Sequence, residues 1–313
     1  MTRPGAAPPG EGGGGGFCYV TPSFLGDIER FALLRASLRL FSPDVPHLAY
    51  IDTEDCPAFR RRFHGDPGLE IVPTAAVLPA GLERQRRRRR GWSGWLVERL
   101  AWRLGWQAPC LSGWKLQQVV KLAALAELPH AAAVFLDSDI LACAPLGRAS
   151  FFTADGRLRL LETPAETYED FAFEFTRQLI VGRRPDEPAA AFNYIHQAPR
   201  FLRRTGARLK AHLATLAEPW YGGILDQILP SEYDLLGFVA RELEAYAGYL
   251  REESAPAGWV YKVAQRQHLD AALDACRAER GRRGFLLIQS NMGIPAAEYG
   301  PRVLPLLEEL AAR

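Results

Sequence analysis

The sequence has no uninterrupted apolar run of the roughly 18 to 20 residues that a membrane span requires. It also has little net charge, because 38 lysine and arginine residues are offset by 36 aspartate and glutamate residues, for a formal charge of +2. Overall charge therefore does not indicate a nucleic-acid partner. The 5 cysteines include no Cys-x-x-Cys pair, so we expect neither a structural zinc site nor a disulfide framework.

The N-terminal segment lacks the apolar core of a secretion signal. Residues 1–16 are rich in glycine and proline, and we interpret them as a disordered tail. The glycine run at 12–16 precedes the first apolar segment instead of following a strand, so it does not have the position of a phosphate loop. We interpret 17–313 as one domain and expect a reduced, cytoplasmic protein.

Strand and helix patterns alternate in the first half of the chain. Apolar residues recur at helical spacing over 28–41, where Asp27 is placed to cap a helix. Further segments of this half favour a strand within 17–24, which Thr21-Pro22-Ser23 breaks, and strands at 47–52, 69–73 and 131–142, with helices at 56–63 and 114–128. The alternation predicts an α/β fold with a mostly parallel central sheet flanked by helices.

The second half is irregular and rich in helical patterns. We expect strands at 157–163 and 284–290 and helices at 199–217, 234–251, 262–280 and 301–313.

An arginine- and tryptophan-rich segment at 79–113 interrupts the first half. It contains the run Arg86–Arg90, and tryptophans follow that run closely within the segment. Basic and aromatic residues together suit a nucleic-acid surface, and an anionic or membrane surface is a second option. Because nearly all basic residues of this chain are arginine, we favour compositional bias in an insertion whose tryptophans pack on the domain.

The most informative motif is an Asp-x-Asp that ends the predicted strand at 131–142. Asp137 and Asp139 flank Ser138 after four apolar residues. Ligands of open α/β sheets bind at the carboxyl ends of the strands. Two carboxylates there can share one divalent cation, Mn²⁺ or Mg²⁺, and leave positions for water and phosphate oxygens. The alternative is that both aspartates only end the strand and cap a turn.

The helix before this strand carries polar residues on one face. Gln118 and Lys121 lie three positions apart, with Gln117 four before Lys121. This face could offer a positive charge and amide groups to a diphosphate. The alternative is that Lys115, Gln117 and Gln118 form a solvated helix face.

Two more regions carry candidate binding residues. At the ends of the first two strands, the expected nucleoside-binding residues are Thr21, Pro22, Ser23, Asp27 and Asp52. Later in the chain, aromatic residues and glycines suit a sugar platform on the acceptor side, and the residues are Trp220, Tyr221, Gly222 and Tyr233. Glu232 or Asp226 could serve as a general base toward an acceptor hydroxyl. His196 or His268 could add a metal ligand, although a lone histidine is more often structural.

Four segments resemble, in order, an uncharacterised bacterial family of glycosyltransferase-like proteins that is counted among the domains of unknown function. They are FCYVTPSFLGDIERFALLRASL, GWKLQQVVKL, VFLDSDI and LPSEYDLLG. More broadly, residues 17–160 look like the GT-A class of nucleotide-sugar transferases. This resemblance implies a single GT-A domain with a donor half at 17–160 and an acceptor half at 161–313. It also implies a metal at Asp137 and Asp139 and a helix with Gln118 and Lys121 facing the donor.

Together these features predict a metal-dependent glycosyltransferase of hexosyltransferase type. Its donor would be a nucleotide-diphosphate sugar, and its acceptor a glycan, a lipid-linked molecule or a small molecule. The alternative is a non-catalytic GT-A-fold binding module that uses the Arg/Trp segment for a protein, an anionic glycan or a nucleic acid. Nucleic acid is the weakest of these partners, and the expected membrane contact, if there is one, is peripheral.

Overall fold

The structure is a computed structural model that describes residues 16–89, 113–164, 192–216, 218–226, 231–253, 260–263 and 265–312. Residues 90–112, which hold most of the Arg/Trp segment, lie outside the described part. None of the described helices combines the length and the apolar composition of a membrane span.

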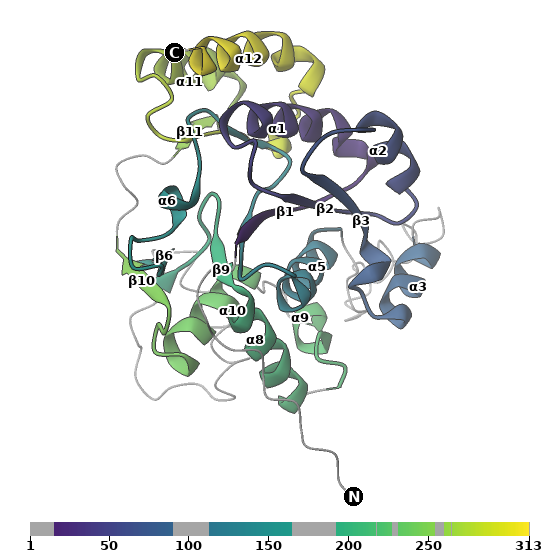
Figure 1. The fold of residues 1–313 in the computed structure, drawn as a ribbon. Helices are drawn as coiled ribbons and strands as arrows, with labels where there is room; N and C mark the ends of the chain where they lie inside the picture. The colour runs from purple at the N-terminus through teal and green to yellow at the C-terminus, as the bar shows by residue number, and fades with distance from the viewer. Residues whose placement is uncertain are drawn as a thin grey trace, which may run out of the picture.

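A five-stranded sheet forms the centre of the molecule (Figure 1). Its strands, in spatial order, are β3 (Leu69–Pro73), β2 (His47–Ile51), β1 (Phe17–Ser23), β4 (Ala132–Phe135) and β9 (Arg200–Leu202). The first four are parallel, and β9 is antiparallel to β4. Strands β1, β2 and β4 are buried throughout, which explains why their sequences are nearly continuous apolar runs.

Helices cover both faces of this sheet, as Figure 1 shows. One face carries α1 (Ile28–Phe41) and α2 (Cys56–Arg62), and the other carries α5 (Gly113–Glu127) and α8 (Arg203–Leu216). The predicted mostly parallel sheet flanked by helices is therefore confirmed. The predicted cap of α1 is wrong, because the Asp27 side chain makes no capping bond and instead accepts a hydrogen bond from Arg30 Nη1 at 2.7 Å.

Directly after β4 the chain leaves the main sheet and enters a second sheet. It has the order β11 (Val260–Val263), β12 (Phe285–Ile288) and β5 (Ile140–Ala142), with β5 antiparallel to β12. The single strand predicted at 131–142 is thus two strands in two sheets. A turn joins them, in which the N–H of Ile140 donates to the carbonyl of Asp137 at 3.1 Å.

The remaining elements are short or lie near the C-terminus. The helices are α3 (Ala80–Arg89), α6 (Arg148–Phe151), α9 (Gly222–Asp226), α10 (Glu232–Phe238), α11 (Leu269–Ala278) and α12 (Ala296–Ala311). The strands are β6 (Leu158–Leu161), β7 (Thr163–Pro164), β8 (Phe192–Asn193) and β10 (Tyr249–Glu252). A π-helix, η3 (Val239–Leu243), follows α10, and the 3-10 helices are η1 (Leu25–Asp27), η2 (Thr74–Ala76), η4 (Arg266–His268) and η5 (Ser290–Met292).

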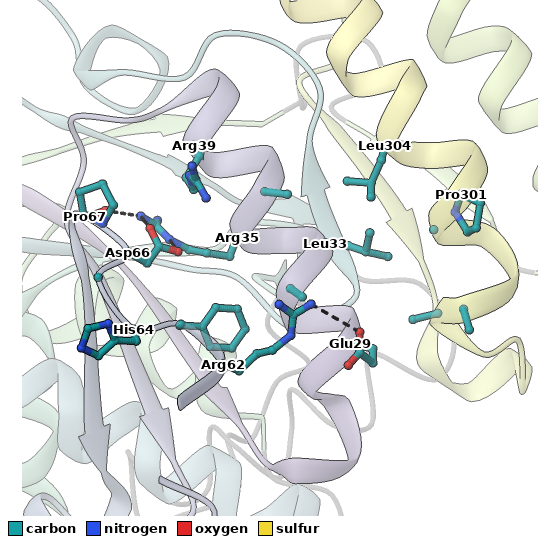
Figure 2. A pocket seen from close by; sticks show the side chains of 17 residues that line it. Glu29, Leu33, Arg35, Arg39, Arg62, His64, Asp66, Pro67, Pro301 and Leu304 are labelled. Carbon is teal, nitrogen blue, oxygen red and sulfur yellow. Dashed lines mark hydrogen bonds and ion pairs between the residues drawn. The ribbon is translucent and has the colours of Figure 1, made fainter. Parts of the chain in front are cut away.

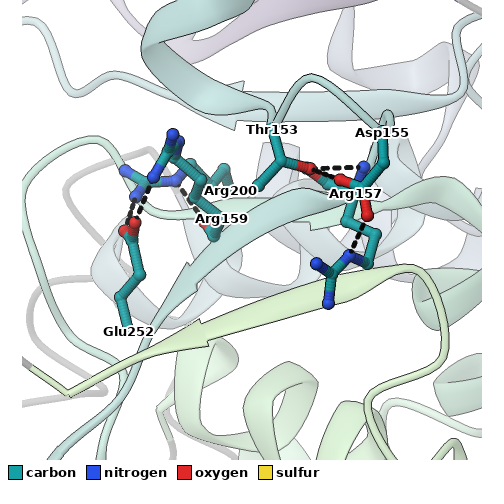
Figure 3. Close-up of polar contacts among 6 residues, drawn as sticks. All are labelled: Thr153, Asp155, Arg157, Arg159, Arg200 and Glu252. Carbon is teal, nitrogen blue, oxygen red and sulfur yellow. Dashed lines mark hydrogen bonds and ion pairs between the residues drawn. The ribbon is translucent and has the colours of Figure 1, made fainter.

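Three predicted helices of the second half begin or end as strands. Residues 200–202 form β9, 249–252 form β10 and 260–263 form β11. Strand β10 pairs in parallel with β6. Figure 3 shows the polar contacts that join these strands: Glu252 lies 2.6 Å from Arg159 Nη1 and 3.4 Å from Arg200 Nη2. Pairing with distant strands therefore overrides the local helical pattern here.

Candidate functional site

The strand order reverses between β1 and β4, and the carboxyl ends of these two strands meet. Chain continuing from β4 stays beside β1, because the N–H of Leu136 donates to the carbonyl of Val20 at 3.0 Å. Further along the same two segments, Ser138 Oγ donates to Ser23 Oγ at 3.0 Å. A crevice at such a reversal is where open α/β sheets bind their ligands.

The two aspartates of the motif, on the turn that we call the acidic turn (137–139), have different surroundings. Asp137 is open to solvent, with 56% of its side chain exposed. Asp139 is partly buried and accepts a hydrogen bond from the backbone N–H of Ser290 at 2.8 Å. Burial, together with the charge of Asp137, raises the pKa of Asp139. A cation between the two carboxylates would relieve this repulsion.

Both carboxylates line one pocket of about 280 Å³, which we call the acidic-turn pocket. Among its other lining residues are Tyr233 from α10, His196 from the loop before β9, and Gln289, which follows β12. The pocket thus combines the end of the main sheet with the end of the second sheet.

Lys121 lies beneath this pocket and joins it to α10. Its ammonium Nζ is 3.1 Å from Asp137 Oδ1 and 2.9 Å from Glu232 Oε1, and it lies 4.7 Å from the centre of the Tyr233 ring. Burial alone lowers the pKa of Lys121, but the charges of Asp137 and Glu232 outweigh burial and hold this pKa well above its usual value. The side chain is therefore a buried, charged ammonium next to a candidate metal ligand.

Helix α10 is held in place by contacts near its start. Ser231 caps it, since its Oγ accepts a hydrogen bond from the N–H of Asp234 at 3.2 Å. The Asp234 carboxylate in turn accepts from the N–H of Tyr194 at 2.9 Å, in the loop that also carries His196. These contacts fix Glu232 and the pocket loop relative to each other.

The polar face of α5 is buried. Lys115 is 7% exposed, Gln118 is 1% exposed and Lys121 is 4% exposed, while Gln117 is half-buried. Lys115 Nζ donates to the carbonyl of Leu225 in α9 at 2.7 Å. The alternative of a solvated face is therefore wrong for Lys115 and Gln118.

The residues predicted to bind the nucleoside do not all reach the surface. Thr21 is fully buried, and its Oγ1 shares a hydrogen bond with His47 Nε2 at 2.9 Å, so its side chain is not available to a ligand. Pro22 and Ser23 are buried within β1. Asp52 is partly exposed at the same sheet edge, where its N–H donates to the carbonyl of Ser23 at 3.3 Å.

The predicted acceptor-side residues separate into two places. Tyr233 lines the acidic-turn pocket, whereas Trp220, Tyr221 and Gly222 lie at the start of α9 and are not among its lining residues. The rings of Trp220 and Tyr221 meet edge to face at 5.7 Å. The side chain of Asp226 lies outside the described part of the chain.

Sequence patterns missed polar residues that line the pocket: Gln197, beside His196, and Gln289 and Ser290. Gln289 and Ser290 lie some 150 residues after the acidic turn in the chain, and no local signal marks them. Of the two histidines considered as extra metal ligands, His196 lines the pocket and His268 is exposed on η4. Ring Nε2 of His196 lies 2.9 Å from the carbonyl of Asn193, and burial lowers the pKa of this imidazole to about 4, which keeps it neutral.

The sequence matches a family of unknown function, DUF6492, over residues 20–299. The chain belongs to this family. That agrees with the resemblance to a family counted among the domains of unknown function. No curated protein matches the sequence. Among solved structures, the apo form of mouse xyloside xylosyltransferase 1 is similar at 12% identity and a TM-score of 0.41, covering 89% of this chain and 100% of that chain.

The oxygen ligands of the acidic turn suit a hard divalent cation. Within the described residues there is no cluster of three or more histidine, cysteine, aspartate or glutamate side chains of the kind that encloses a metal. Mg²⁺ is commonly held by one or two carboxylates and completed by water and substrate phosphates. Within the described residues, Asp137 and Asp139 of this DUF6492 member therefore offer carboxylate oxygens to a cation from one side and leave its other positions open.

Proposed function

We propose that this chain is a metal-dependent glycosyltransferase that moves a sugar from a nucleotide-diphosphate sugar to an acceptor hydroxyl. One observation carries the proposal: both carboxylates of the acidic turn line one pocket where the strand order reverses, and the buried ammonium of Lys121 lies 3.1 Å from Asp137. Opposite charges arranged around one pocket suit a diphosphate that binds together with its cation.

The residues divide the binding of the donor among them. Asp139 and Asp137 would hold Mn²⁺ or Mg²⁺, which when bound supplies positive charge against the diphosphate leaving group. Lys121 would add a second positive charge from the side of α5. Asp52, at the edge formed by β1 and β2, and Asp27, before the first turn of α1, would contact the nucleoside.

Glu232 has two candidate roles in this scheme. As a general base toward the acceptor it would have to release Lys121, which it contacts at 2.9 Å with only 8% of its own side chain exposed. As a positioning residue it would keep the ammonium of Lys121 directed at the pocket. The buried ion pair supports the positioning role, and the acceptor-base role then passes to Asp226 or to another residue.

Calorimetric titration of UDP and GDP, with Mn²⁺ and then with EDTA, tests the proposal. We expect one nucleotide to bind only with metal, and Asp139→Asn to weaken that binding by about tenfold or more, because a direct ligand is lost. Asp155→Asn is the matched control, since among the described residues the Asp155 side chain bonds Thr153 and Arg157, in an exposed turn before β6 (Figure 3). Nucleotide binding that EDTA and Asp139→Asn both leave unchanged would contradict the metal role.

Turnover provides the second half of the test. A nucleotide sugar of the base that binds should be hydrolysed slowly in the presence of metal, because water can replace the missing acceptor. Binding without hydrolysis or transfer to any offered acceptor would favour the non-catalytic alternative.

A further inference from the structure

A second pocket lies on the outer side of α1, away from the acidic turn (Figure 2). It is a groove of about 570 Å³ between α12 and the turn that joins α2 to β3, and we call it the α1–α12 groove. This volume falls within the roughly 300 to 1,000 Å³ of small-molecule sites. Its lining residues include none of those that line the acidic-turn pocket.

Small side chains create the hollow. Ala32 and Ala36 lie one turn apart on α1, and opposite them α12 presents Ala297 and Gly300. Larger apolar side chains border this floor, namely Leu33, Pro301 and Leu304, which Figure 2 shows on the α12 side. Leu304 is 36% exposed, so the groove leaves apolar surface open to water. An open apolar surface rimmed by polar groups marks an interaction site.

Arginines line the rim of the groove, and nearby carboxylates neutralise their charges to different degrees. Arg35 is buried and already paired, because its Nε and Nη2 each lie 3.0 Å from the carboxylate of Asp66. Arg62 lies 4.0 Å from Glu29, and more than half of each side chain is exposed, so this pair is weak. Arg39 is exposed and has no hydrogen-bond or ion-pair partner within the described residues.

These features favour an anion over a neutral or cationic ligand. The guanidinium group suits phosphate in particular, because its planar fork can donate two parallel hydrogen bonds. A simple phosphate ion has no apolar part that could contact the apolar floor beside these groups.

We propose that the α1–α12 groove binds an anionic amphiphile, that is, a phosphate head group joined to an apolar chain. The phosphate contacts Arg39 at the rim, and the chain lies on Ala36 and the exposed side of Leu304. This site is independent of the proposed glycosyl transfer, since it uses other residues and needs neither nucleotide nor metal.

Three probes separate the contributions of head group and chain. Octyl phosphate carries both, inorganic phosphate carries only the head group, and octanol carries only the chain. In metal-free buffer, below the concentration at which octyl phosphate forms micelles, calorimetry should show it binding about tenfold more tightly than either of the other two. Equal binding of octyl phosphate and inorganic phosphate would overturn the proposal and leave a simple anion site.

Two variants locate the binding. Arg39→Glu should weaken octyl phosphate by about tenfold, because an attractive charge becomes repulsive and no native partner is lost. Ala297→Trp should block the apolar floor, and the exposure of Ala297 lets the protein fold, which circular dichroism and the melting temperature check. Arg208→Glu on α8 is the matched control for charge reversal, because Arg208 is also exposed and lies on a helix across the sheet (Figure 1).

The same titrations also test whether octyl phosphate binds in this groove. Wild-type affinity for octyl phosphate in both Arg39→Glu and Ala297→Trp would overturn the assignment. Displacement of octyl phosphate by a soluble glutamate-rich peptide, at a lower concentration than octyl phosphate itself requires, would also overturn it in favour of an acidic protein partner.

Discussion

Replacing Lys121 with methionine should show whether the buried ion pair holds the candidate site together. The side chains of Lys121 and Glu232 are 6% and 8% exposed and their charged atoms lie 2.9 Å apart. Removing one partner of a buried pair costs about 3–5 kcal/mol, because the remaining charge has lost its partner away from water. Asp137 is 56% exposed, so its contact with Lys121 adds at most about 1 kcal/mol.

A double-mutant cycle separates the ion pair from other effects of the substitution. Lys121→Met should lower the free energy of unfolding by about 3–5 kcal/mol, and Glu232→Gln by less, because Lys121 keeps Asp137 as a partner. The double variant should be more stable than Lys121→Met alone, since it leaves no unpaired carboxylate. The expected coupling energy is about 1–3 kcal/mol.

Equilibrium urea unfolding followed by tryptophan fluorescence measures these differences. Lys210→Met is the matched control: Lys210 lies 2.6 Å from Glu127, but the two side chains are 35% and 49% exposed, so the loss should stay under about 1 kcal/mol. The reasoning is refuted if Lys121→Met costs no more than this control, or if the two single effects add to the double effect within about 0.5 kcal/mol.

Two further perturbations test the fold around the site. Burial lowers the pKa of His47 to about 3, so the unfolded chain takes up the proton first and stability falls as pH drops below about 6.5. Between pH 6.5 and 4.5 wild type should lose about 2 kcal/mol more than His47→Gln, and equal pH slopes would contradict this. Gly237→Ala should cost about 1–3 kcal/mol, because its new Cβ would lie 2.3 Å from the Tyr194 ring. Gly300→Ala is its control, since the nearest atoms, on Leu33, are 3.5 Å away and thermal melts should show no loss.

The first half of the fold could be predicted from sequence because its signals are local. Buried parallel strands such as 17–23 and 47–51 are nearly continuous apolar runs, and the helix at 28–41 repeats its apolar residues at helical spacing. The strands of the second half have two to four residues each and exist through distant partners. Residues 200–202, for example, pair with 132–134, and no local pattern contains that information.

The candidate site shows the same division. The acidic turn could be located from its apolar strand and its spacing, and the structure places Lys121 beside it. What the sequence could not show is which side of each element is buried: Thr21 lies inside the sheet, Lys115 is buried against α9, and Gln118 is buried as well. Polar residues on an amphipathic pattern are expected in water, so their burial depends on tertiary contacts that spacing alone does not reveal.

The bond between Ser290 and Asp139 has a consequence for how the protein is made. A chain leaving the ribosome exposes the acidic turn early, and the strands before it can already pair. The amide that holds Asp139 emerges only 151 positions later, on the segment after β12. A nascent chain would therefore form most of its main sheet before the amide of Ser290 is present to hold the acidic turn. The acidic turn would then take its final arrangement only after residue 290 has been made.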